Sequence, residues 1–396
     1  MPRFMSDAHL PIVAAASLVP LILGWIIYPR WICRGRRTSP PVGQGAFGRS
    51  VTCVLATRDE PDVVAARVRN LRDASYPANL IDVVVAVDYR STFAPDAYAG
   101  VLDIASVVIR GDAPGGKAAA MNAGVRSARG EIVLLVDSRQ VFEPDTISTL
   151  LAGFDTGKFA AVSGVVALER EDRVMRWYWG YEIGIRRGQA AHRSLVTTSG
   201  AITALRRDAW HPIPVGAICD DLFLTIGLAQ RGLRVGLVEG AVAHDPRLLD
   251  RKDRFAKKVR TLTGLVQFIR WNPAALLPWR NPVWADFYAH KLLRLATPPL
   301  LAIATLATGA WLAQHASRSV AFLVAAITVA LVIVALFRPS QTRRVLSSGL
   351  WAVSLLAAPL VALLNGAMGS WDVWQPHPST ARASEDHGAS TGPATP

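Results

Sequence analysis

Long apolar stretches and shorter amphipathic segments alternate along this chain of 396 residues. Four of the apolar stretches approach the length of about 20 residues that a bilayer-spanning helix needs. They cover residues 10–28, 295–312, 320–337 and 345–368, and none contains a charged side chain. The pattern therefore predicts one transmembrane helix near the N-terminus and three near the C-terminus.

The arginines beside these stretches predict their orientation. Four arginines lie at residues 30–37, directly after the first stretch, and no small-residue cleavage site intervenes. This favours a retained anchor over a secretory signal. Because flanking positive charge stays on the cytoplasmic side, residues 38–290 are expected in the cytoplasm. The chain is then a multi-pass protein of the plasma membrane.

The region between the first two spans alternates strand-length apolar runs with helix-length segments. Strands are expected at residues 51–57, 81–88, 105–111 and 131–137, and helices at residues 61–74 and 117–128. This alternation predicts an α/β domain with a mostly parallel sheet covered by helices. We expect an anchor at residues 1–37, a cytoplasmic domain with interfacial helices at 38–290, three transmembrane helices at 291–370 and a disordered tail at 371–396.

The composition agrees with a membrane protein, since 51% of the residues are hydrophobic and only 18% are charged. The net charge of +13 comes partly from the arginines beside the spans. No zinc-finger spacing, RNA-recognition signature or basic stripe on a soluble helix is present, which argues against nucleic-acid binding. Three scattered cysteines, Cys33, Cys53 and Cys219, suit neither a disulfide framework nor a zinc site.

Polar side chains follow three of the expected strands. Thr57 and Glu60 follow the first, Asp88 closes the second and Asp137 closes the fourth. Since the carboxyl ends of parallel strands meet at one edge, where ligands bind, a site is expected there. The alternative is that these residues only terminate strands and cap helices.

Two glycines precede Lys117 at the start of an expected helix, where free N–H groups favour anions. The Walker spacing is absent, and a solvated lysine is the alternative. Asp137 could hold Mg²⁺ or Mn²⁺ together with substrate phosphates. Arg139 could itself face a phosphate, unless these residues only form a local ion pair.

Adjacent carboxylates at Asp220 and Asp221 open a helix that ends near Gly232. Such neighbours repel each other, so the pair suggests a task or a cationic partner. A carboxylate beside an acceptor hydroxyl can serve as a general base, although Asp220 could simply be a helix cap. Six basic residues at 251–260 suit either a membrane surface or a polyphosphate.

In this order, the segments resemble the family 2 glycosyltransferases, especially the membrane-embedded group of cellulose, chitin and hyaluronan synthases. The likeness covers about residues 50–270. Residues 56–60 are similar to the family's Pro-Thr-Tyr-Asn-Glu turn, and residues 116–124 to its Gly-Lys-x-x-Ala-Leu-Asn-x-Gly segment. The resemblance implies a GT-A fold and inverting transfer from a nucleotide-sugar donor to a polysaccharide or lipid-linked acceptor at the cytoplasmic membrane face.

The resemblance also implies a role for each matched residue. Asp221 is the expected general base. Donor contacts are expected from Thr57, Glu60, Asp88, Lys117, Asn122, Asp137 and Arg260. The acceptor side is expected at Ser199, Gly200, Asp220 and Gln267.

Two departures from the family pattern bear on function. Arg139 stands in place of the second acid of Asp-x-Asp, so Asp137 alone is left for a divalent cation and metal dependence stays open. Thr261 stands in place of the tryptophan that stacks on the acceptor sugar in polymer synthases, which argues against long-chain extension.

Two enzyme classes therefore remain open, a polysaccharide synthase and a single-step transferase that acts on a lipid-linked acceptor. Spans without charged residues offer no polar path for a polymer, which favours the second class or an assembly of several subunits. That assembly would be a homo-oligomer or a complex with envelope-biosynthesis partners, in contact with membrane lipids. The non-catalytic alternative is a nucleotide-sugar-binding or scaffold protein of the same fold.

Overall fold

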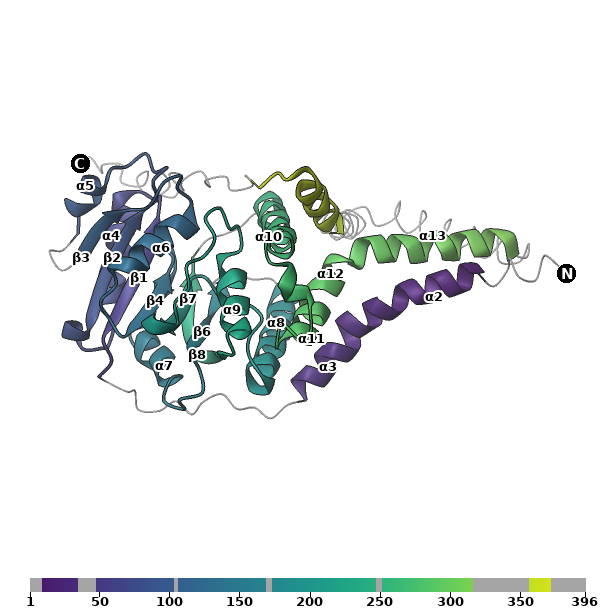
Figure 1. The fold of residues 1–396 in the computed structure, drawn as a ribbon, viewed down its shortest axis with the longest axis horizontal. Coiled ribbons are helices and arrows are strands. Elements are labelled where there is room, and N and C mark those ends of the chain that lie inside the picture. Colours follow the sequence, from purple (N-terminus) through teal and green to yellow (C-terminus); the bar gives the residue numbers. More distant parts are fainter. Residues whose placement is uncertain are drawn as a thin grey trace, which may run out of the picture.

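The computed structural model describes residues 9–34, 48–102, 106–168, 173–246, 251–315 and 356–371. Within these residues a mixed sheet, with helices on both faces, occupies one end of the molecule (Figure 1). Helices α2 (His9–Ile22) and α13 (Thr297–His315) pack against each other and extend away from the sheet at the other end.

The described residues form an eight-stranded sheet in the order β3-β2-β1-β4-β7-β6-β8-β5. The strands are β1 (Val51–Thr57), β2 (Ile81–Val87), β3 (Ser106–Arg110), β4 (Ile132–Val136), β5 (Val141–Phe142), β6 (Ala161–Leu168), β7 (Ile202–Arg206) and β8 (Val235–Asp245). The first four pair in parallel, as do β6 and β8, whereas β7 runs antiparallel to both β4 and β6. The expected mostly parallel α/β sheet is confirmed, and all four expected strands are present.

Helices cover the sheet and connect it to the apolar end. They are α4 (Pro61–Arg72), α5 (Pro95–Ala99), α6 (Lys117–Ser127), α7 (Thr146–Ala152), α8 (Arg173–His192), α9 (Asp220–Gln230), α10 (Arg251–Trp271), α11 (Trp284–Phe287) and α12 (Leu293–Leu295). Shorter helical turns are η2 (Ala78–Leu80), η3 (Arg207–Ala209), η4 (Pro273–Leu276) and η5 (Tyr288–Leu292). The helices expected at residues 61–74 and 117–128 are α4 and α6.

The sheet buries apolar side chains on both faces, which explains why its strands read as continuous apolar runs. Cys53 and Leu55 of β1 lie in one buried cluster with α4 and α7. Val54, which points the opposite way, lies in a second cluster with α6 and α9. A third cluster joins α9 to α10 and α11. The carboxyl end of β4 lies close to the start of α9, since Lys117 contacts both Asp137 and Asp220.

One continuous helical segment, His9–Cys33, is long and apolar enough to cross a membrane. It consists of α2, η1 (Leu23–Ile27) and α3 (Tyr28–Cys33) and includes the first predicted span. The second predicted span corresponds to α13, which meets Trp284–Leu295 at a bend of 58° and could form a broken span with it. The described residues therefore contain at most two spans.

The remaining C-terminal predictions are described only in part. Residues 320–337, the predicted third span, lie outside the described residues, as does the tail from residue 372. Of the predicted fourth span, the structure describes only the apolar helix Leu356–Met368.

The N-terminal helix is joined to the α/β domain through α8. Tyr28 donates a hydrogen bond to Asp286 Oδ1 at 2.9 Å and accepts one from Gln189 at 2.9 Å. Ile32 packs on Ile185 in a small buried cluster. These contacts place the C-terminal end of the apolar segment His9–Cys33 beside the sheet domain.

Candidate active site

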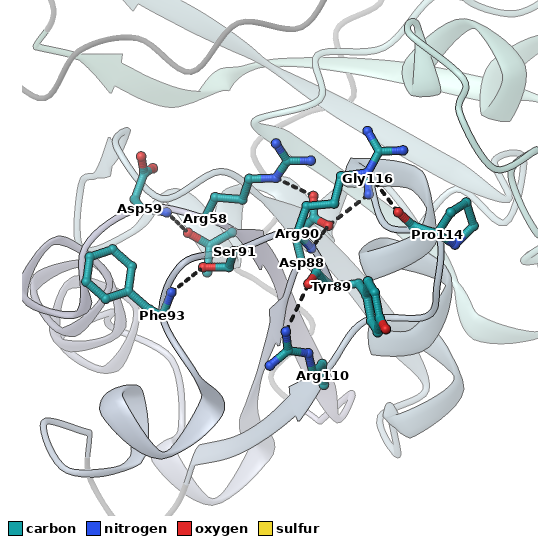
Figure 2. A network of polar contacts seen from close by, with 11 residues as sticks. Arg58, Asp59, Asp88, Tyr89, Arg90, Ser91, Phe93, Arg110, Pro114 and Gly116 are labelled. Atoms are coloured by element: carbon teal, nitrogen blue, oxygen red, sulfur yellow. Dashed lines mark hydrogen bonds and ion pairs between the residues drawn. The ribbon is translucent and has the colours of Figure 1, made fainter. Parts of the chain in front are cut away.

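Asp88 ties together three loops at the carboxyl edge of the sheet (Figure 2). Its Oδ2 accepts a hydrogen bond from Arg58 Nε at 2.5 Å, and its Oδ1 accepts backbone N–H groups of Arg90 and Gly116 at 3.0 and 2.8 Å. Gly115 has φ +89°, and a Cβ there would lie 2.6 Å from Asp88 Oδ1. Glycine is required here both by the backbone conformation and by the close approach.

The turn after β1 is linked to the end of β4. Thr57 Oγ1 accepts the N–H of Asp59 at 2.9 Å, and Asp59 forms an ion pair with Arg139 at 2.6 Å. Ser138 donates a further hydrogen bond to Asp59. Glu60 is exposed at the start of α4. Arg139, expected either to face a phosphate or to pair locally, is thus paired with an aspartate from another turn.

Lys117 connects three elements that lie far apart in the sequence. Its Nζ lies 2.9 Å from Asp137 Oδ1 at the end of β4 and 3.2 Å from Asp220 Oδ2 at the start of α9. Burial opposes the charge, but Asp137 and Asp220 raise the pKa of Lys117 above its usual value. A Cβ at Gly200 would lie 3.3 Å from Lys117 Nζ, so the expected acceptor-side turn adjoins this ammonium group.

The expected general base lies next to this ion cluster. Burial, followed by the neighbouring charge of Asp220, raises the pKa of Asp221 to about 6, whereas Lys291 and Lys117 oppose that rise. Arg186 is a further cation that interacts with Asp221. A carboxylate with a pKa near 6 is ionised at neutral pH and still basic enough to accept a proton.

Helix α10 is hydrogen-bonded to the segment that leads into Asp221. Gln267 donates to the carbonyl of Gly216 at 3.0 Å and accepts the N–H of Ile218 at 2.9 Å. The Cys219 thiol lies 3.4 Å from the carbonyl of Thr261. Burial raises the pKa of that thiol, and Arg260 acts in the opposite direction. Gln267, expected on the acceptor side, is fully buried and holds the loop that leads into Asp221, while Arg260 is partly exposed.

Gly264 allows this close approach, which gives a stability prediction. A Cβ at Gly264 would lie only 2.4 Å from Cys219 Sγ. We expect Gly264→Ala to lower the free energy of unfolding by about 1–3 kcal/mol through overpacking. Thermal unfolding of the detergent-solubilised protein measures this. Adding Cys219→Ala should recover part of the loss.

Gly227→Ala is the matched control, because a Cβ at this glycine of α9 meets nothing within 4 Å. This change should be neutral or stabilising, since alanine favours a helix over glycine by about 1 kcal/mol. Equal unfolding temperatures for the Gly264→Ala and wild-type proteins would contradict the packing argument.

Two other predicted residues, Asn122 and Ser199, make hydrogen bonds that hold the backbone of this region. Asn122 exchanges two hydrogen bonds with the backbone of Ile213, at 2.8 and 2.9 Å, and is buried. The N–H of Ser199 donates to Ser163 Oγ at 2.9 Å, and Arg186 donates to the same oxygen at 3.1 Å. Ser163 therefore connects the turn before Gly200 with a cation near Asp221.

The residues at this edge could hold a divalent cation only together with the phosphates of a bound donor. No group of three His, Cys, Asp or Glu side chains that could hold a metal occurs among the described residues. Mg²⁺ commonly binds through one or two carboxylates plus substrate phosphates. Asp137 directly follows β4, and its side chain is 35% exposed. It could supply such a carboxylate.

Sequence reasoning did not identify three basic residues at or near the site, Arg67, Arg186 and Lys291. Arg67 is buried over the Phe142 ring at 3.9 Å and donates to the carbonyl of Asp137 at 3.2 Å. It thereby holds the turn that carries the candidate metal ligand. None of the three belongs to a motif, so their positions emerge only from the fold.

The family model described as "Glycosyltransferase like family 2" matches residues 48–265, more than half of the chain. The chain belongs to this family. It is therefore a glycosyltransferase, and the expected family resemblance is confirmed at this level. The matched region contains Lys117, Asp137 and Asp221.

The fold of this family 2 glycosyltransferase is supported by one solved structure. It resembles the structure described as "Mannosyltransferase PcManGT from Pyrobaculum calidifontis in complex with GDP-Man and Mn2+", with a TM-score of 0.68 and 20% identity over 91% of this chain and 99% of that one. A structure described as "Crystal Structure of a Mycobacterial Protein" is a weaker match, at TM-score 0.41 and 17% identity over 56% and 74% of the two chains. No curated protein sequence matches the chain.

Proposed function

We propose that this glycosyltransferase transfers a sugar from a nucleotide-sugar donor to an acceptor hydroxyl, with inversion at the anomeric carbon. The observation that carries the proposal is the contact of Lys117 with Asp137 and Asp220, directly beside the partly buried Asp221. It combines a cation for a leaving diphosphate with a carboxylate base at one sheet edge. The mannosyltransferase neighbour, whose structure contains GDP-Man and Mn²⁺, supports a nucleotide-sugar donor.

The chemistry is a single displacement. The acceptor oxygen forms a bond to the anomeric carbon while the bond from that carbon to the diphosphate oxygen breaks. Asp221 takes the hydroxyl proton, and Lys117 and Arg260 stabilise the charge on the departing nucleoside diphosphate. A divalent cation held by Asp137 and the donor phosphates would add positive charge there. One displacement inverts the anomeric configuration and needs no carboxylate nucleophile.

We also propose that the catalytic domain lies at the cytoplasmic face of the plasma membrane. His9–Cys33 is the anchor in this arrangement, and many of its apolar side chains are exposed. Arg30 and Arg34 at the end of that helix favour the cytoplasmic side. Residues 291–370 would supply the further membrane helices of a multi-pass protein, and residues 371–396 its tail.

Release of free nucleoside diphosphate from a panel of nucleotide sugars tests the reaction. Purified membranes that contain the protein are expected to release it from one donor class, with less release in EDTA and recovery with added Mn²⁺. Asp137→Asn should raise the Mn²⁺ concentration needed for half-maximal release by about tenfold or more, because a contact to a charged group is lost. Donor binding without release or transfer under all conditions would contradict catalysis and support the scaffold alternative.

A further inference from the structure

A cluster of charged residues lies between the candidate active site and the base of the apolar helices. We name it the headgroup cluster, and its members are Glu182 and Arg186 of α8 with His290, Lys291 and Arg294 of η5 and α12. Glu182 forms an ion pair with Arg294 and accepts a hydrogen bond from His290 at 3.0 Å. The cluster thus bridges the α/β domain and the segment leading into α13.

Positive charge exceeds negative charge within the headgroup cluster. Arg186, Lys291 and Arg294 are cationic, whereas Glu182 is the only carboxylate that belongs to it. Glu182 already uses both oxygens for Arg294 and His290. Asp221 also faces Arg186 and Lys291, so the three cations still exceed the two nearby carboxylates by one charge. An additional anion would balance that charge.

Several donors in the headgroup cluster lack a hydrogen-bond partner. Nε of Arg186 and both Nε and Nη2 of Arg294 are buried without one. Lys291 forms no hydrogen bond or ion pair with another of the described residues. Buried donors are nearly always satisfied in native proteins, so these donors indicate the place of a ligand rather than a completed network.

The headgroup cluster reaches the active site on one side and the apolar helices on the other. Arg186 and Lys291 both interact electrostatically with Asp221. The Arg294 guanidinium lies 4.6 Å from the centre of the Trp25 ring and 5.4 Å from that of Tyr181. Trp25 belongs to the apolar N-terminal segment and donates a hydrogen bond to Thr297 of α13. A ligand here would place an anion beside the base and a tail beside α2 and α13.

We propose that the headgroup cluster binds the phosphate of an acceptor phospholipid, whose headgroup carries the hydroxyl that is glycosylated. Guanidinium groups suit phosphate oxygens through paired hydrogen bonds. The lipid chains would lie along exposed apolar side chains of α2 and α13, such as Ile12, Val19 and Leu306. The inference rests on the proposed function and specifies its acceptor.

A hydroxyl acceptor must lose a proton when it attacks, and this distinguishes it from a lipid monophosphate. In the proposed reaction the headgroup hydroxyl attacks the anomeric carbon, its proton passes to Asp221, and the lipid phosphodiester stays intact. A lipid monophosphate would attack through a phosphate oxygen, which is already deprotonated and needs no base. The position of a carboxylate base, Asp221, beside Arg186 and Lys291 therefore favours a hydroxyl acceptor.

Lipid retention by the full-length protein tests the proposal. Native mass spectrometry of protein from mixed micelles would compare phosphatidylglycerol, which has a phosphate and a headgroup hydroxyl, with diacylglycerol, which has no phosphate. We expect phosphatidylglycerol to be retained and diacylglycerol not. Lys291→Gln should weaken retention by about tenfold or more, because it removes a charged contact. Lys291→Arg, which keeps the charge, should retain the lipid.

Arg280→Gln is the matched control, since Arg280 is an exposed cation in the same region and lies outside the headgroup cluster. Equal retention by the Lys291→Gln and Arg280→Gln proteins would overturn the proposal. Retention of diacylglycerol as strong as that of phosphatidylglycerol would also overturn it. Glycerol 3-phosphate is a competitor without lipid chains. If it displaced phosphatidylglycerol as effectively as the phospholipid itself does at equal concentration, the site would bind anions without lipid selectivity. That result would contradict a lipid acceptor.

Transfer assays separate this proposal from the proposed function. We expect the wild-type protein to transfer labelled sugar to phosphatidylglycerol and the Asp221→Asn protein not to do so. Labelled sugar on undecaprenyl phosphate that survives Asp221→Asn would overturn the hydroxyl acceptor and leave glycosyl transfer intact. Absence of nucleoside diphosphate release from every donor, despite lipid retention, would instead contradict the proposed function alone.

Discussion

Replacing Asp221 with asparagine is expected to lower turnover by about 10²- to 10⁴-fold, the usual contribution of a general base. Asparagine has nearly the same shape but cannot accept the acceptor proton at neutral pH. Donor binding should change little, because Lys117, Asp137 and Asp220 keep their mutual contacts. Single-turnover transfer and donor titration on the same preparation measure the two quantities separately.

The pH dependence gives an independent check on the same residue. Burial and Asp220 raise the pKa of Asp221 to about 6, so the carboxylate predominates above that pH and is lost below it. The rate should therefore be level near pH 8 and fall about tenfold per pH unit well below pH 6. Asp208→Asn, an exposed aspartate, serves as the control. Near wild-type turnover in Asp221→Asn would remove Asp221 from the mechanism.

Replacing Lys117 with methionine is expected to lower kcat/KM by about 10²- to 10³-fold, comparable to removing one preorganised donor of an oxyanion site. Methionine keeps much of the length but removes the charge that would face the leaving diphosphate. It also leaves Asp137 and Asp220 without their shared cation. Steady-state kinetics over a range of donor concentrations would measure the loss.

The Lys117→Met variant should also shift the pH profile upward. Lys117 lowers the pKa of Asp221, so its removal raises that pKa and protonates the base at a higher pH. Lys158→Met is the control, because Lys158 is exposed after α7. A Lys117→Met protein that loses only thermal stability, with unchanged kcat/KM per folded molecule, would assign Lys117 a purely structural role.

Much of the α/β domain was predictable because its signals are local. Each expected strand is a short apolar run bounded by turn residues, and the observed strands begin and end within one residue of the expected positions. The antiparallel placement of β7 between β4 and β6 was not predicted. Neighbour order in a sheet depends on long-range pairing, which apolar periodicity does not encode.

The candidate site was predictable where motifs end strands or begin helices. Lys117, Asp137 and Asp220 come together as expected of residues at one sheet edge. Asn122 belongs to a recognised motif, yet the structure uses its amide to hold the backbone of Ile213. Arg67 and Arg186 belong to no motif, because a cation's effect on a carboxylate depends on distance and burial rather than on sequence spacing.

The family, the α/β alternation and the apolar N-terminal helix follow from the sequence alone, which also predicts Asp221 as the base. These follow from local composition and from the order of short motifs. Only the tertiary structure decided that Arg139 pairs with Asp59 and that Gln267 fixes the loop before Asp221. The fold also brings Arg186 and Lys291 close to the Asp221 carboxylate, which the sequence did not predict. Electrostatic interactions act through space, so residues distant in the chain acquire a shared chemistry only when the fold brings them together.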